Sequence, residues 1–130
     1  MDLTDSLHEI LEQQDKLADL FYLVFLEHHP DVQRYFFGVD MKRQNTLLTM
    51  ALIVVERHAQ GQYEVARSYL RLLGKKHLER GIPREAYPKW HQAMMGTLER
   101  FHGPNWSAPL AEQWSAALDS AIAAMLTVYP

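Results

Sequence analysis

Apolar residues recur every three to four positions along nearly all of this 130-residue chain. That spacing places them on one face of a helix and is the main local signal for α-helical structure. The six prolines and six glycines lie mostly between these periodic segments, where helices end. The one cluster of β-branched residues, Ile53 to Val55, lies inside a longer helical pattern. The sequence therefore predicts an all-α protein.

The periodic segments predict seven helical pieces joined by connections of a few residues. We expect helices at about 4–14, 16–28, 31–36, 40–58 and 63–78, then one from Tyr87-Pro88 to Gly103-Pro104 and one from a Ser107 cap to about Val128. The second helix is apolar almost all round, which is typical of a buried helix. The uneven lengths, with a very short third helix, favour packing at steep crossing angles over a plain bundle.

Length and composition exclude several classes of protein. The chain is predicted to form one domain, residues 1–130, with 48% hydrophobic and 22% charged residues. It has no cysteine, which excludes thiolate catalysis, cysteine-bound zinc and iron–sulfur clusters. The net charge of −3 is a poor match for nucleic acid or anionic lipid.

The same features bear on membranes and location. The longest apolar run, Leu20 to Leu26, has seven residues, whereas a membrane span needs about twenty. The chain begins with the acidic stretch Met1-Asp2-Leu3-Thr4-Asp5, which lacks the basic start of a secretory signal. We therefore expect no membrane span and a cytoplasmic location, and the absence of cysteine is consistent with a reducing compartment.

His77 is the most informative of the seven histidines. It lies on an apolar helix face, four residues after Leu73, and Gly74 removes side-chain bulk where a flat ligand could approach. A buried neutral imidazole can bind iron through one nitrogen while the other N–H donates to a nearby carbonyl. Lys76 and Arg80 would suit a cofactor with carboxylate tails. The alternative is a core histidine that is hydrogen-bonded to a carbonyl.

The remaining histidines have simpler interpretations. None has the spacing of a helical zinc site. We expect His28 and His29 to satisfy the terminal carbonyls of a helix. We expect His8, His58 and His102 to be exposed or at helix ends, and His91 to be half-buried.

Tyr22 lies in an aromatic group that otherwise suits a simple core. Its hydroxyl, between Phe21 and Leu23, needs a partner if it is buried, and a polar ligand in a pocket would supply one. A polar turn, residues 42–45, precedes Leu47-Leu48. This turn is either a solvated helix start or a hydrogen-bond donor that reaches the same pocket as Tyr22.

Three stretches together resemble the bacterial single-domain globins, a flavohaemoglobin-like family without the reductase domain. Residues 20–36 resemble the second helix and the phenylalanine corner at Phe36, and residues 40–48 resemble the distal helix. Residues 73–82, Leu-Gly-Lys-Lys-His-Leu-Glu-Arg-Gly-Ile, resemble the proximal segment, and Tyr87-Pro88 follows them. The resemblance covers about residues 15–127, with only a weak match in the first helix.

The resemblance implies a globin fold of about seven helices around a pocket for haem b. It implies that His77 is the axial iron ligand and that Tyr22 is the distal tyrosine that donates to a gas ligand. The distal polar residue is Arg43 if the chain aligns without a gap from Phe36, and Gln44 if Asp40-Met41-Lys42 is matched. The apolar stripe favours Arg43, whereas residue type favours Gln44, which we prefer. The other expected cofactor contacts are Phe36, Phe37, Leu47, Leu48, Leu73, Lys76, Ile82, Tyr87 and Trp90.

The resemblance implies reversible binding of dioxygen, and of nitric oxide or carbon monoxide. Tyr87 matches a tyrosine linked to the proximal histidine, but the partnering glutamate is missing from residues 125–130, and no reductase domain is present. These departures weaken the alternative of a nitric oxide dioxygenase or peroxidase-like enzyme with an external reductase. A further alternative is a gas or redox sensor that acts through a partner protein, and it is less favoured because we expect no output domain after Pro130. A non-haem helical module would lack the ligand histidine. The oligomeric state stays open.

Overall fold

The computed structural model describes residues 1–130, with every side chain except that of residue 63. Helices make up its regular structure, as predicted, and no strand occurs in the described chain. The elements in chain order are α1 (Leu3–Glu12), α2 (Gln14–His28), η1 (Pro30–Phe36), α3 (Met41–Ala59), α4 (Tyr63–Glu79), α5 (Ala86–His102), η2 (Gly103–Asn105) and α6 (Ala108–Leu126), where η marks a 3₁₀ helix.

Local hydrogen bonds explain where three of the helices begin. The Asp2 side chain accepts from the Asp5 amide at the start of α1, and the Asp40 side chain accepts from the amides of Lys42 and Arg43 at the start of α3. Ser107 accepts from the Leu110 amide at 3.3 Å and caps α6, as its position in the sequence predicts. Each cap satisfies an amide that has no partner within its helix.

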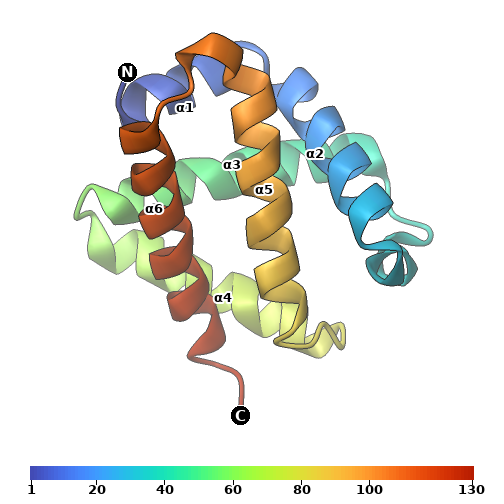
Figure 1. Cartoon of the computed structure of the whole chain (residues 1–130). Helices are drawn as coiled ribbons and strands as arrows, with labels where there is room; N and C mark the ends of the chain where they lie inside the picture. Colours follow the sequence, from blue (N-terminus) through green and yellow to red (C-terminus); the bar gives the residue numbers. More distant parts are fainter.

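The helices cross in two levels. In Figure 1, α5 and α6 run down the near side, and α3 crosses behind them at a steep angle. The most extensive helix contacts join α2 to α5 and α4 to α6, and α3 also packs on α2, α4 and α6. The interior between them is apolar, and its largest fully buried side chains include Trp114, Phe21, Ile10, Leu17, Leu52, Leu70, Met94 and Leu98.

Gly74 allows α4 and α6 to pack closely. A Cβ atom at this position would lie 2.2 Å from the carbonyl oxygen of Met125, which is far inside van der Waals contact. The interpretation that Gly74 makes room for a flat ligand is therefore wrong. The missing side chain makes room for the backbone of α6.

Two histidines that were expected to be exposed or at helix ends are buried. His58 and His102 are only 3% and 5% exposed, although both are at helix ends: His58 lies in the last turn of α3 and His102 is the last residue of α5. His102 Nε2 lies 2.6 Å from Ser6 Oγ, which also accepts from Trp114 Nε1 at 2.9 Å. This network joins α1, α5 and α6, and it gives the buried Nε2 of His102 a polar partner. His91 is half-buried, as predicted.

None of the described helices is both long enough and apolar enough to cross a bilayer.

Candidate functional site

Tyr22 and Gln44 form a polar pair between α2 and α3. The Gln44 amide Nε2 donates a hydrogen bond to the Tyr22 hydroxyl oxygen at 3.0 Å. Tyr22 is 6% exposed, and burial raises the pKa of its phenol to about 12, although the Gln44 bond opposes that shift. The hydroxyl therefore stays protonated at neutral pH. Because its oxygen already accepts from Gln44 and no described residue accepts its proton, Tyr22 can donate to another group.

Aromatic rings surround this pair. The Phe36 ring meets the Tyr22 ring edge-on at 5.5 Å, and Phe21 lies 5.0 Å from Tyr22. Trp90 of α5 lies 5.7 Å from Phe21 and is half-buried. Leu48, one turn after Gln44 on α3, is buried. The hydroxyl of Tyr22 is thus a polar group in an apolar setting, where a hydrogen bond is stronger than in water.

His77 lies on α4 with one ring nitrogen held. Its Nδ1 is 3.2 Å from the Tyr87 hydroxyl, and no described residue hydrogen-bonds its Nε2. Partial burial, together with the nearby positive charge of Arg80, lowers the pKa of His77 to about 4. The imidazole is therefore neutral at physiological pH, which is the form that binds metals.

The Tyr87 hydroxyl links His77 to Tyr129, in the segment that follows α6. It lies 3.2 Å from the hydroxyl of Tyr129, which in turn donates to the main-chain carbonyl of Ile82 at 2.8 Å. Tyr87 is 4% exposed, and burial, followed by the bond to Tyr129, raises the pKa of its phenol far above the usual range. His77 and Tyr87 are therefore both uncharged at neutral pH.

The structure sorts the other predicted contact residues. Leu73 and Ile82 are half-buried on the side of His77 and pack against the core, whereas Lys76 is exposed. Arg43 is also exposed, and it does not reach Tyr22, to which Gln44 is bonded. Two further apolar side chains lie largely in solvent: Phe37 is 80% exposed and Leu47 is 39% exposed. Of these predicted contacts, Leu73 and Ile82 pack against the core, whereas the other four side chains are exposed.

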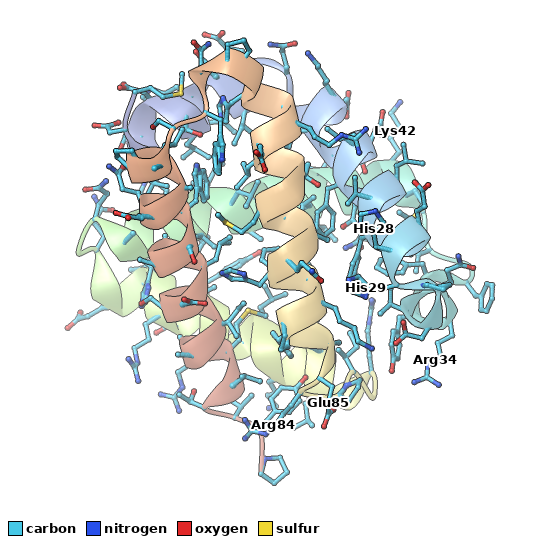
Figure 2. All side chains as sticks on the ribbon, viewed as in Figure 1. His28, His29, Arg34, Lys42, Arg84 and Glu85 are labelled. Atoms are coloured by element: carbon cyan, nitrogen blue, oxygen red, sulfur yellow. The ribbon has the colours of Figure 1, made fainter. Side chains whose placement is uncertain are left out.

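Sequence reasoning missed Tyr129 and Arg84. The sequence of residues 125–130 shows that the expected glutamate is missing, but no local pattern assigns a role to the hydroxyl of Tyr129. Figure 2 shows Arg84 at the lower end of the molecule, where the chain leads from α4 to α5. A tyrosine three residues beyond a mainly apolar helix is a weak signal that a buried hydroxyl needs a partner.

Comparison with known proteins identifies the family to which this fold belongs. Residues 18–126 match the family model described as Globin. This chain belongs to the globin family. Its fold is similar to that of a Pseudomonas aeruginosa protein described as structurally highly homologous to human haemoglobin, with 24% identity, 98% coverage of both chains and a TM-score of 0.82. It is also similar to a bacterial globin from Campylobacter jejuni, with 18% identity, coverage of 98% of this chain and 94% of the other, and a TM-score of 0.83. No curated protein has a significantly similar sequence.

Membership of the globin family implies haem binding, and three features of the structure fit that group. His77 is a neutral imidazole whose Nδ1 is held and whose Nε2 has no partner among the described residues. Tyr22 has a proton to donate in an apolar setting. Lys76 and Arg80, on the helix of His77 and just beyond it, are exposed cations that suit carboxylate tails.

Proposed function

We propose that this globin holds haem b through His77 and reversibly binds dioxygen, and other diatomic gases, on the side of Tyr22 and Gln44. The observation that carries the proposal is the state of His77: Nδ1 is engaged by Tyr87 while Nε2 has no partner in the described chain. Haem, when bound, would supply an iron that binds a diatomic gas, and His77 would be the residue that ligates this iron.

Tyr22 and Gln44 would serve as the distal polar residues. Gln44 donates to the Tyr22 oxygen, and this bond orients the hydroxyl and leaves its proton available. A donor aimed at a position where negative charge develops stabilises that charge. The Gln44–Tyr22 bond supports Gln44, rather than Arg43, as the distal polar residue.

Haem titration into the full chain tests this proposal. We expect one haem per chain, and absorption bands of the ferrous protein that differ under nitrogen, dioxygen and carbon monoxide. His77→Ala should abolish these native bands or weaken haem retention at least about tenfold, because an axial ligand is lost.

His91→Ala is the matched control, because His91 is also a half-buried helical histidine but contacts Asp119 instead. It should bind haem as the wild type does. If wild-type protein takes up no haem, or if His77→Ala leaves the ferrous spectra and haem retention unchanged, the proposed ligation is wrong.

A further inference from the structure

We propose that Tyr129 is a positioning residue that closes a hydroxyl chain and thereby holds His77 as the Nδ1–H tautomer, with the lone pair on Nε2. The importance of this tautomer for haem rests on the proposed function. The hydrogen-bond argument itself rests only on contacts in the protein. Four groups form the chain, in the order His77, Tyr87, Tyr129 and the carbonyl of Ile82.

The direction of each hydrogen bond follows from counting protons. The Ile82 carbonyl can only accept, so the Tyr129 hydroxyl donates to it at 2.8 Å. Tyr129 has one proton, so in its contact with Tyr87 it must accept, and Tyr87 donates. Tyr87 has then used its own proton, so in the contact with His77 its oxygen accepts, and His77 Nδ1 carries the hydrogen.

The opposite tautomer leaves one contact without a proton. If Nδ1 carried only a lone pair, Tyr87 would have to donate to it, and the oxygens of Tyr87 and Tyr129 would face each other 3.2 Å apart with no hydrogen between them. Tyr87 and Tyr129 are only 4% and 9% exposed, so bulk solvent cannot easily correct this mismatch. A buried polar group without its partner is unfavourable enough to bias the tautomers about tenfold or more.

Arg84 fixes the position of Tyr129. Its Nη2 donates to the main-chain carbonyl oxygens of Tyr129 and Pro130 at 3.3 and 3.1 Å, and its guanidinium lies 5.6 Å from the centre of the Tyr129 ring. In Figure 2, Arg84 lies beside the lower end of α6, where these last residues leave the helix. The Tyr129 ring also meets the Tyr87 ring edge-on at 5.7 Å. The contacts with Arg84 and with the Tyr87 ring together direct the Tyr129 hydroxyl at Tyr87 and Ile82.

The chain of hydroxyls ends on a neutral acceptor. In the described structure Tyr129 contacts no carboxylate, and its proton goes to a main-chain carbonyl. A carboxylate at this position would draw the proton of Tyr87, and in turn that of His77, and would make the imidazole more basic. The neutral end instead favours an ordinary neutral imidazole ligand. We therefore infer that this proximal side supports ligand binding more than the electron donation that favours O–O cleavage.

The haem-free full chain, labelled with ¹⁵N, gives the direct test. Two-bond ¹H–¹⁵N spectra at neutral pH distinguish a protonated ring nitrogen from an unprotonated one. In the wild type we expect the Nδ1–H tautomer of His77 to predominate by about tenfold or more. In Tyr129→Phe, Tyr87 loses its acceptor and can donate to Nδ1, so the Nε2–H tautomer should gain about tenfold. Arg84→Gln, at an exposed position, should shift the ratio in the same direction if Tyr129→Phe does not fold.

Tyr35→Phe is the matched control. It removes the hydroxyl of a half-buried tyrosine, which accepts from Arg34. This hydroxyl lies outside the series of hydrogen bonds that runs from His77 to Ile82. Tyr35→Phe should leave the His77 tautomer unchanged. A wild-type His77 that is mainly Nε2–H, or the same tautomer ratio in the wild type, Tyr129→Phe and Arg84→Gln, would overturn the proposal.

Haem-loaded protein separates this inference from the proposed function. In ferrous protein, resonance Raman spectroscopy reports the iron–histidine stretching frequency, which we expect to fall in Tyr129→Phe because Tyr87 becomes a poorer acceptor for Nδ1–H. Haem bound through His77 with the same frequency and the same tautomer in both proteins would refute the positioning role alone. A tautomer shift in a chain that takes up no haem would refute the proposed function alone.

Discussion

Gly74→Ala is expected to destabilise the protein, although alanine is the better helix former. The added Cβ would lie 2.2, 2.8 and 2.9 Å from three backbone atoms of Met125. Ordinary contact begins at 3.4 Å, so α4 and α6 would have to separate locally by about 1 Å. The obstacle is helical backbone, which cannot turn aside as a side chain can.

The magnitude follows from two opposing effects. Overpacking of this kind costs about 1–3 kcal/mol, and the upper part of that range applies because the neighbour is backbone. The replacement of glycine by alanine inside a helix contributes about 1 kcal/mol in the other direction. We therefore expect the free energy of unfolding to fall by about 1–2 kcal/mol. The same displacement would strain the 3.2 Å contact between His77, one turn later on α4, and Tyr87.

Gly96→Ala is the matched control. Gly96 lies inside α5, and a Cβ there would meet nothing within 4 Å, so the helix-propensity gain should appear alone, as a stabilisation of up to about 1 kcal/mol. Urea unfolding of both variants and the wild type, at equal haem content, measures the difference in the free energy of unfolding. A shift of the urea midpoint at an unchanged m-value gives that difference. Opposite signs support the close helix contact. A Gly74→Ala protein as stable as Gly96→Ala would refute it.

Two further predictions concern the distal pair and the buried histidine network. Tyr22→Phe should speed dioxygen release about tenfold in stopped-flow experiments, because the loss of one hydrogen bond of about 1.4 kcal/mol corresponds to that factor. Carbon monoxide is a poorer hydrogen-bond acceptor, so its release should change less. Burial lowers the pKa of His102 below its usual 6.5, while Glu9 opposes the shift. As the pH falls, His102 therefore binds a proton in the unfolded chain before it does so in the folded chain. The contribution of neutral His102 to the free energy of unfolding is present above pH 6.5 and is lost as the pH falls below 6.5. Urea midpoints should thus drop from about pH 7 to about pH 5 more steeply in the wild type than in His102→Gln, and equal slopes would contradict the assignment.

Local sequence patterns are enough to predict which segments are helical and where several of the helices begin. Helix formation depends on residues three and four apart and on caps such as Ser107, and both are visible in a linear sequence. The same local logic singled out His77 on an apolar face and Tyr22 as a hydroxyl among aromatic residues. These are properties of a residue and its near neighbours, so the sequence alone could predict the main candidate ligand and the candidate donor.

Which side chains contact one another depends on how the helices pack. Periodicity shows that α3 has an apolar face, but the rotation of α3 against α2 determines that Gln44, rather than Arg43, bonds to Tyr22. The sequence suggested that the missing side chain of Gly74 leaves space for a ligand, but in the structure the backbone of α6 fills this space. The contact between Tyr129 and Ile82 joins residues 47 positions apart. Such pairings are set by the packing of whole helices, which no local pattern encodes, and they determine how His77 is held.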